Sequence, residues 1–325
     1  MRVAQLMGPH VLDLFCGAGG FAAGFREAGF NILGAVDQSY TAFLSYHHNF
    51  PNALFFNTDL HQFHSLDILD KLGVTPDVII ASPPCEPYTA ANIRRQKEPL
   101  DRLYEDEVGQ LVLDAIRIIG DIHPKLFVVE NVPELLSGEV EWALEREFHR
   151  VGYPEIHFNI LFAEDYGTPS RRKRLFISNI YLRPVRQPSP APVHEILTLP
   201  EPTAFHDIPN HVWYPISPKK SRKLRKTRRG NALVFYQSAT HKTYTNWVRL
   251  APNALAPTVI GHSRFIHPFE DRVLTVRENA RLMGFPDTFC FFGGLDDQYD
   301  QVGEAVPVPL AAAIAQFCLK NLEKI

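Results

Sequence analysis

Short apolar runs alternate with helix-like segments along the first 180 residues of the chain. A glycine-rich turn and a helical segment at about 21–28 follow the first run, and a helical stretch from Gln38 follows the second. Strands that alternate with helices are typical of a doubly wound, mostly parallel sheet. We therefore predict a Rossmann-like α/β fold with strands at 11–15, 32–36, 53–56, 77–81, 126–130, 156–162 and 175–180.

This alternation is lost after a proline-rich stretch at 184–202. Proline-rich segments are semi-rigid spacers, so we interpret this stretch as a connector between two lobes. The length of 325 residues also favours two lobes over one. A second, smaller domain is therefore expected after the connector.

The composition is that of a soluble globular protein, with 45% hydrophobic and 21% charged residues. We find no stretch near the roughly 18 apolar residues needed to cross a bilayer, and no signal peptide. A cytoplasmic protein without membrane contact is therefore expected. The four cysteines are far apart and form no metal-ligand pattern, which predicts reduced thiols and no bound metal: Cys16, Cys85, Cys290 and Cys318.

The net charge of −3 does not by itself indicate a nucleic-acid partner, but the charge is unevenly distributed. Residues 219–229 hold eight basic residues in eleven. A basic segment on an otherwise acidic chain favours a local polyanion site, and a flexible solvated loop is the alternative. The basic residues are Lys219, Lys220, Arg222, Lys223, Arg225, Lys226, Arg228 and Arg229.

The glycine-rich turn after the first predicted strand fits a G-x-G-x-x-A nucleotide-binding pattern that begins at Gly17. Glycines let the backbone approach a ligand closely, and the next helix offers unpaired N–H groups. Asp37 ends the second strand 20 residues beyond Gly17, where a carboxylate can bind ribose hydroxyls. With Asp59 after the third strand, the pattern predicts an adenosine-containing cofactor and leaves S-adenosylmethionine and NAD both open.

Cys85 lies on a proline-stiffened loop directly after the predicted strand at 77–81. This position presents a thiol at the carboxyl edge of the sheet, although an isolated cysteine is more often structural. Glu130 ends the fifth strand and is expected at the same edge. In the extended stretch that follows Ser170, Arg172 and Arg174 point to one side and Arg171 and Lys173 to the other.

Several motifs follow one another in the chain: Asp13-Leu-Phe-Cys-Gly-Ala-Gly-Gly-Phe21, Pro83-Pro84-Cys85, Glu130-Asn131-Val132, Arg172-Lys-Arg174, and a C-terminal block at 272–286 and 303–309. Together, in this order, they resemble the cytosine-5 DNA methyltransferase family, of the bacterial type with a single catalytic unit. Only residues 183–248 lack a counterpart, as expected for a target-recognition region.

The resemblance implies a methyl transfer from S-adenosylmethionine to C5 of a cytosine flipped out of double-stranded DNA. Cys85 would add to C6 of the ring, and Glu130 would relieve the charge at N3. Arg174 would bind the cytosine O2, Arg172 a phosphate beside the flipped nucleotide, and Asn131 would hold the pocket.

The resemblance also implies the binding residues and the domain boundaries. Residues 1–184 and 300–325, with a returning helix near 307–322, would form the catalytic domain, and 185–299 the small target-recognition domain and hinge. The cofactor would be bound by Phe15, Gly17, Gly19, Gly20, Asp37, Asp59, Leu60, Pro84, Leu111, Glu304 and Ala305. DNA would be bound by the basic run, by Thr258, and by Arg94, Arg95 and Lys97 of a mobile catalytic loop at about 88–107.

Three residues depart from the family pattern. Glu86 follows the catalytic cysteine where Gln is usual, Glu304 replaces an Asn in the C-terminal motif, and Ser170 stands where Gln is commonest. A carboxylate at position 304 would repel the carboxylate of the cofactor unless it points away or pairs with a cation. These departures concern cofactor affinity and loop contacts rather than the fold.

Three alternatives remain open at this stage. The RNA-acting branch of the family methylates tRNA, but its characteristic Cys-Phe-Thr is missing because residues 183–248 contain no cysteine. A catalytically weak DNA-binding homologue and an NAD enzyme are the others. We expect a monomeric prokaryotic enzyme, associated with the nucleoid, with or without a cognate restriction endonuclease, because no regulatory domains flank the catalytic unit.

Overall fold

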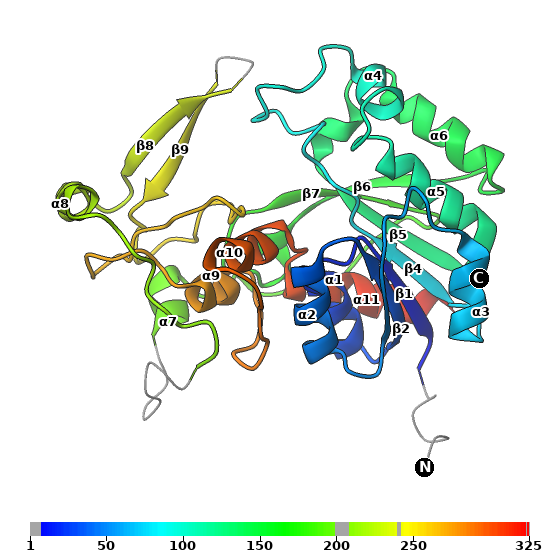
Figure 1. The fold of residues 1–325 in the computed structure, drawn as a ribbon, viewed down its shortest axis with the longest axis horizontal. Coiled ribbons are helices and arrows are strands. Elements are labelled where there is room, and N and C mark those ends of the chain that lie inside the picture. The colour runs from blue at the N-terminus through cyan, green and yellow to red at the C-terminus, as the bar shows by residue number, and fades with distance from the viewer. Residues whose placement is uncertain (1–7, 199–207, 239–241, 323, 325) are drawn as a thin grey trace.

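A seven-stranded sheet forms the centre of the larger part of the molecule in this computed structural model, which describes residues 8–198, 208–238, 242–322 and 324 (Figure 1). The strand order is β3-β2-β1-β4-β5-β7-β6, and β7 is antiparallel to both of its neighbours. This arrangement confirms the predicted mostly parallel α/β fold. The strands are β1 (His10–Leu14), β2 (Asn31–Asp37), β3 (Leu54–Asn57), β4 (Val78–Ala81), β5 (Leu126–Asn131), β6 (His157–Phe162) and β7 (Lys173–Ser178).

The central strands are apolar because both of their faces are covered. Alternate residues of β4 enter two different cores, Ile80 on one face and Ile79 on the other. The first core also contains residues of α1 (Gly20–Glu27), α2 (Tyr40–Asn49) and α11 (Val308–Leu322). The second contains residues of α3 (Ser65–Leu72), α5 (Leu111–Ile122) and α6 (Val140–Arg150). This two-sided burial explains why these strands read as continuous apolar runs.

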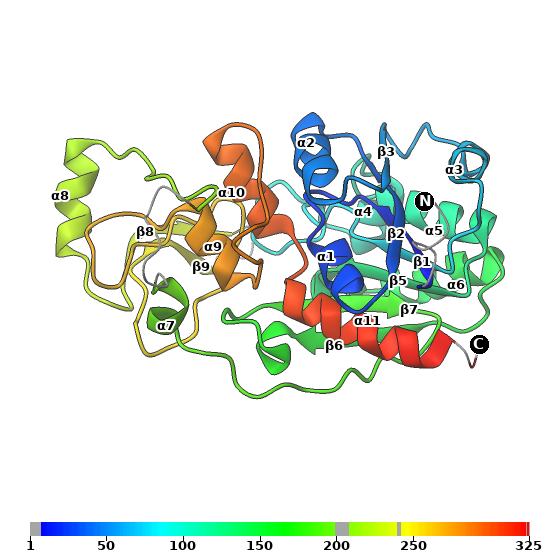
Figure 2. The same cartoon turned by 90° about the horizontal axis from the view of Figure 1, so that it is seen from below.

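The C-terminal helix α11 returns to the sheet and packs against α1, as Figure 2 shows. With α10 (Leu295–Glu304) it forms the stretch Leu295–Leu322, which is long and apolar enough to span a membrane by composition alone. The most apolar window of that stretch is 67% buried inside the protein. This stretch is therefore part of the core of the protein. The expectation that the chain has no apolar stretch of this length was wrong, because α10 and α11 together form one.

A second, smaller sheet lies at the opposite end of the molecule from α3 in both views (Figures 1 and 2). Strands β8 (Ala232–Gln237) and β9 (Thr243–Val248) form an antiparallel hairpin beside α8 (Pro218–Lys226). Leu224, Trp247, Ile266 and Val273 form a small core beneath them. The remaining elements are α4 (Pro99–Tyr104), the 3-10 helices η1 (Pro133–Leu136) and η2 (Ala163–Tyr166), α7 (Val193–Leu197) and α9 (Val276–Leu282).

The basic run at 219–229 is largely helical and not a flexible loop. Pro218 occupies the first turn of α8, and the Ser217 side chain accepts a hydrogen bond from the backbone N–H of Lys220. Leu224 is fully buried and fixes one face of the helix against the small core. Of the proline-rich connector, residues 199–202 lie outside the described part of the chain.

The contact between α1 and α11 gives a test of the packing. A Cβ atom added at Gly24 would lie 2.4 Å from the Cβ of Ala311 and 2.4 Å from the backbone N of Ala312. Helix propensity alone favours alanine over glycine by about 1 kcal/mol. Because the two helices must move apart, we expect Gly24→Ala instead to lower the free energy of unfolding by about 1–3 kcal/mol. Urea denaturation measures this, with the exposed Glu27→Ala on the same helix as control; stabilisation by Gly24→Ala would contradict the packing.

Candidate active site

The topology brings the predicted catalytic residues to one edge of the sheet. Strands β1, β4 and β5 are parallel, so their carboxyl ends lie at the same edge. Strand β7 is antiparallel to β5 and therefore begins at this edge. Cys85 follows β4, Glu130 lies near the end of β5, and Arg174 is the second residue of β7. Strand β7 begins at Lys173, two residues earlier than predicted, which places Arg174 within the sheet opposite Leu161.

Cys85 lies at the start of a turn and is half-buried. Its carbonyl oxygen accepts hydrogen bonds from the backbone N–H groups of Tyr88 and Thr89. The Thr89 hydroxyl lies 3.0 Å from the same oxygen and 3.7 Å from Sγ. Burial, and then the charge of Glu130, raise the pKa of the Cys85 thiol, while Arg174 opposes them. The resting residue at neutral pH is therefore a thiol.

Glu130 and Arg174 form a buried ion pair. The Arg174 Nε lies 2.8 Å from Glu130 Oε1, and the two side chains are only 12% and 8% exposed. The next residue, Asn131, is completely buried. Its side-chain nitrogen donates to the Pro83 carbonyl at 3.2 Å, and its side-chain oxygen accepts from the Val132 N–H at 2.9 Å. Asn131 thus joins the end of β5 to the loop that carries the cysteine.

Arg172 lies inside the protein. It is 2% exposed, and its Nη1 donates to the carbonyl oxygens of Val259 at 2.6 Å and Gly303 at 2.8 Å. Its Nη2 lies 3.4 Å from the Glu304 carbonyl. Burial lowers the pKa of Arg172, although a guanidinium remains charged at neutral pH. Its Nη1 and Nη2 atoms thus face carbonyl groups inside the protein, whereas its Nε has no hydrogen-bond partner among the described residues, and the contact of Arg172 with a DNA phosphate stays a prediction.

The glycine-rich turn is built to leave room for a ligand. The backbone N–H of Gly17 donates to Asp37 Oδ2 at 2.9 Å, and a Cβ atom added at Gly17 would meet nothing within 4 Å. Gly19 has φ of 97° and begins α1. Phe15 has φ of 54°, which is uncommon for an aromatic residue. Burial raises the pKa of Asp37. The open turn and its carboxylate fit an adenosine-containing cofactor.

Two more of the predicted cofactor residues lie in the segment after β3, and a third begins α5. Leu60 is buried, whereas Asp59 and Leu111, the first residue of α5, are half-buried. Arg117 on α5 donates to the Leu60 carbonyl at 2.9 Å and holds this segment in place. The sequence interpretation did not include Arg117. The sequence does contain a signal for it. Arg117 follows Asp114 by three residues, a spacing that brings two side chains together on one helix face, and the two residues form an ion pair.

The predicted catalytic loop after Cys85 is held at its base by buried contacts. Arg102 is 5% exposed and donates to the carbonyl oxygens of Gln96 and Lys97, both at 2.7 Å. Arg94 and Lys97 are exposed, whereas Arg95 is half-buried and donates to the Tyr88 carbonyl at 3.2 Å. Arg102 was not among the predicted residues, because its burial depends on carbonyl groups that the pattern of residue types does not reveal.

Most of the predicted DNA-binding basic residues are exposed on and just after α8. They are Lys219, Arg222, Lys223, Arg225, Lys226, Arg228 and Arg229. Lys220 is half-buried, with Nζ 3.5 Å from the centre of the Trp247 ring. Arg229 donates to the Pro268 carbonyl at 3.0 Å. Thr258 is exposed, and its hydroxyl donates to the Arg171 carbonyl at 2.8 Å. The helix therefore presents most of its charge to solvent and uses Lys220 for packing.

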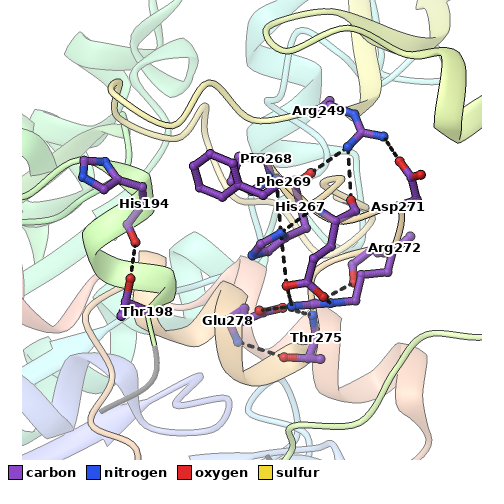
Figure 3. A network of polar contacts seen from close by, with 12 residues as sticks. His194, Thr198, Arg249, His267, Pro268, Phe269, Asp271, Arg272, Thr275 and Glu278 are labelled. Carbon is purple, nitrogen blue, oxygen red and sulfur yellow. Dashed lines mark hydrogen bonds and ion pairs between the residues drawn. The ribbon is translucent and has the colours of Figure 1, made fainter. Parts of the chain in front are cut away.

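A buried polar network joins α8 and the hairpin to α9 (Figure 3). Arg249, directly after β9, donates to the Leu224 carbonyl at 2.9 Å and to Asp271 at 2.7 Å. Figure 3 shows Arg272 directed at Glu278, which it contacts at 2.7 and 2.8 Å. Glu278 also accepts from the backbone N–H of Thr275 in the capping box of α9. The network fixes the basic helix relative to the rest of the small lobe.

Gly20 and Ala305, two of the predicted cofactor residues, are in contact at the glycine turn. Ser170, one of the three departures from the family pattern, has a structural role. A Cβ atom on Gly20 would lie 2.8 Å from the Ala305 Cβ, so this glycine allows the segment after α10 to approach the turn. Pro84 is half-buried beside the cysteine. Ser170 is completely buried, and its hydroxyl donates to the Leu282 carbonyl at 2.7 Å. The short Ser170 side chain therefore joins the segment before β7 to α9.

Comparison with known proteins agrees with this geometry. Residues 10–320 match the model of the family described as C-5 cytosine-specific DNA methylase. The chain belongs to this family. It is 44% identical to the provisionally named type II methyltransferase M.MJ0563P of Methanocaldococcus jannaschii, over 96% of this chain and 100% of that protein. It is 32% identical to the type II methyltransferase M.DdeI of Desulfomicrobium norvegicum, over 94% of this chain and 88% of that protein.

Solved structures show the same fold. A provisionally named DNA modification methyltransferase encoded within a prophage in E. coli has a TM-score of 0.77 at 24% identity, covering 98% of this chain and 100% of that one. The Dnmt2 methyltransferase of S. pombe has a TM-score of 0.66 at 17% identity, covering 95% and 98%. Family membership confirms the prediction of a DNA cytosine-5 methyltransferase over an NAD enzyme. The family uses S-adenosylmethionine as its methyl donor.

The electrostatics of Cys85 can be tested without substrate. In Glu130→Gln the negative charge that raises the pKa of Cys85 is removed and Arg174 loses its anionic partner, so the pKa should fall. We expect Cys85 to react several-fold faster with iodoacetamide at pH 8 in this variant, measured by mass spectrometry of the Cys85 peptide. Cys290, which is also half-buried, is the internal control. Equal Cys85 rates in the two proteins would contradict the assigned coupling.

Proposed function

We propose that the protein methylates C5 of a cytosine flipped out of a specific double-stranded DNA sequence, through a covalent adduct with Cys85. The observation that carries the proposal is the convergence of the Cys85 thiol and the buried Glu130–Arg174 ion pair at the edge of the sheet that also holds the open glycine turn. The closeness of this thiol, the ion pair and the open turn supports the proposed reaction.

Each residue has a chemical role in the proposal. Cys85 loses its proton and adds to C6 of the cytosine, which makes C5 nucleophilic. Glu130 shares a proton with the ring nitrogen N3 and so relieves the negative charge that develops there. Arg174, held by its ion pair with Glu130, binds the ring oxygen O2. C5 takes the methyl group and leaves S-adenosylhomocysteine. The C5 proton then passes to solvent water, and the electron pair of the C5–H bond restores the C5=C6 double bond as Cys85 leaves C6 as a thiolate. Asn131 donates to the Pro83 carbonyl and so holds the loop that carries Cys85 in a fixed position relative to the end of β5.

The residues around the glycine turn would hold S-adenosylmethionine, which supplies an electrophilic methyl group when bound. Phe15 would stack on the adenine, Asp37 would bind the ribose, and Asp59 with Leu60 and Leu111 would flank the adenine. The fit is supported by the open space above Gly17 and by the fixed Asp37 carboxylate. The other predicted cofactor residues are Gly19, Gly20, Pro84, Glu304 and Ala305, of which Ala305 packs against Gly20.

DNA would be bound by both parts of the molecule. The catalytic loop and the β8–β9 hairpin rise on the same side of the molecule (Figure 1). Lys223, Lys226 and Arg228 line a basic hollow of about 450 Å³, suited to phosphate groups. Base-edge contacts from 183–248 would then set the sequence specificity. Flipping the base out of the duplex costs on the order of a few kcal/mol, because its stacking is lost, and the contacts with DNA must offset this cost.

The proposal extends to the setting of the enzyme. The relatives' names place them among type II methyltransferases, so a prokaryotic restriction-modification setting, with or without a cognate endonuclease, is supported. We further propose a nucleoid-associated monomer whose catalytic domain comprises 1–184 and 300–325, with 185–299 as target-recognition domain and hinge. The chain crossing between β7 and α7 and the return of α11 to the sheet support these boundaries.

The assigned nucleophile can be tested with tritiated S-adenosylmethionine and either unmodified plasmid DNA or tRNA. The protein should label cytosine in DNA, whereas Cys85→Ser should lose at least about a thousandfold in transfer rate. The variant should still bind DNA with similar affinity, because Cys85 is one half-buried side chain. Label in tRNA alone, or no label in either, would refute the proposed reaction, and turnover retained by Cys85→Ser would refute the nucleophile.

The role of the basic helix can be tested by the salt dependence of DNA binding. Each phosphate contact contributes about 0.9 to the slope of log K against log salt concentration. We expect the double variant Lys223→Gln with Lys226→Gln to reduce this slope by about 2, and to do so equally for DNA of different sequences. The matched control is Lys320→Gln with Lys324→Gln, two exposed lysines at the C-terminal end. An unchanged slope in the first variant would rule out phosphate contacts by these lysines.

A further inference from the structure

A short turn at residues 267–270 is closed by the side chain of its own first residue. The Nδ1 atom of His267 accepts hydrogen bonds from the backbone N–H groups of Glu270 at 3.0 Å and Phe269 at 3.3 Å. The side chain of His267 is only 9% exposed. These two bonds need a lone pair on Nδ1, so the imidazole is neutral and carries its proton on Nε2. Neutral His267 therefore shapes the turn.

The closed turn directs carbonyl groups at two arginine residues of the small lobe. The Nη1 atom of Arg249 donates to the carbonyl oxygens of His267 and Glu270, both at 3.1 Å. The Nε atom of Arg229 donates to the Pro268 carbonyl at 3.0 Å. The turn lies next to Arg249 in Figure 3. Three carbonyl groups of one turn therefore hold two cations.

Both arginine residues connect the turn to the basic helix α8. Arg249 also donates to the Leu224 carbonyl, near the end of α8, at 2.9 Å. Arg229 is the last residue of the basic run at 219–229. The backbone N–H of the next residue, Gly230, donates to the Arg249 carbonyl at 2.8 Å. The position of α8 thus depends on a turn that His267 closes.

We propose that neutral His267 is a positioning residue for the basic helix α8, and that its protonation at acid pH opens the turn and weakens DNA binding. The effect on DNA binding rests on the proposed function, whereas the coupling of His267 to α8 does not. A proton on Nδ1 makes this atom a donor, which can no longer accept from the N–H groups of Phe269 and Glu270. A protonated Nδ1 can instead donate to Glu270 Oε1, which lies 3.4 Å away. Protonation thus exchanges two bonds to the backbone for one to a side chain.

The surroundings of His267 keep it neutral at pH 7. Burial is the main cause that lowers its pKa, and the positive charges of Arg272 and Arg249 act in the same direction. The carboxylates of Glu278 on α9 and of Glu270 oppose them. The folded protein therefore protonates His267 only below the usual pKa of about 6.5. Because the unfolded chain binds this proton more readily, the stabilisation by the closed turn is present above that pH and is lost as the pH falls.

Two substitutions separate the lone pair of His267 from its titration. In His267→Asn the amide Oδ1 takes the place of Nδ1 and can accept the same N–H groups, but it does not titrate. In His267→Leu no acceptor remains. The measurements use the full chain at pH 7.5 and pH 5.0. Fluorescence anisotropy at several salt concentrations gives the affinity for DNA, and hydrogen exchange is followed in the peptides that cover 218–229 and 267–272.

The wild-type protein should respond to acid, and His267→Asn should not. Between pH 7.5 and pH 5.0 we expect the dissociation constant for DNA to rise about fivefold in the wild-type protein relative to His267→Asn. The slope of log K against log salt concentration should fall by about 1–2, because phosphate contacts of α8 are lost. Hydrogen exchange in both peptides, corrected for the intrinsic rate at each pH, should accelerate at pH 5.0 in the wild-type protein alone. His267→Leu should behave at pH 7.5 as the wild-type protein does at pH 5.0.

His149→Asn is the matched control, because it removes an exposed histidine from α6 in the larger part of the molecule. Equal pH dependence of exchange and affinity in the wild-type protein and His267→Asn would overturn the role of His267, and so would a loss of that dependence in His149→Asn. Acid-accelerated exchange of 218–229 without a change in DNA affinity would support the coupling and instead overturn DNA binding by α8. Thermal unfolding verifies that each variant is folded. If His267→Leu does not fold, the comparison of the wild-type protein with His267→Asn still tests the proposal.

Discussion

The arrangement of the active site depends on one buried cation. Arg172 lies directly before β7 and donates to carbonyl oxygens 87 and 131 residues further along the chain. A buried guanidinium without partners would be costly, so these carbonyl groups are necessary for its burial. Gly303 and Glu304 end α10, where the helix dipole places partial negative charge. One side chain thus joins the sheet, the segment at Val259 and the end of α10.

The neighbouring charges follow from this arrangement. Arg174, two residues on in the same extended segment, points to the same side and meets Glu130 at 2.8 Å. The Glu130 charge helps to keep Cys85 as a thiol, and a thiol reacts more slowly than a thiolate with oxidants and alkylating agents. The charges of Arg174, Glu130 and Glu304 all act on Arg172. The cations and carboxylates of the site are therefore electrostatically coupled.

The fold and the grouping of Cys85, Glu130 and Arg174 could be predicted from the sequence for the same physical reason. A strand covered on both faces is a continuous apolar run, and its carboxyl end is marked by the first polar residues, such as Glu130 and Asn131. The parallel order then places these residues together without any knowledge of side-chain contacts. Arg172 could not be assigned in this way. A pattern shows that it shares a side with Arg174, but its burial depends on distant carbonyl groups.

The small lobe was harder to predict because its structure is specified by polar contacts. The run at 219–229 has no apolar periodicity beyond Leu224, and it is helical because Ser217 caps it and Leu224 fills the small core. Arg249 donates to the Leu224 carbonyl, which lies near the end of this helix, and to Asp271. This network holds α8 by a backbone carbonyl, so the exposed side chains of α8 can be replaced without loss of that contact. A lobe held in this way can change its exposed side chains without disturbing the sheet edge where Cys85, Glu130 and Arg174 meet.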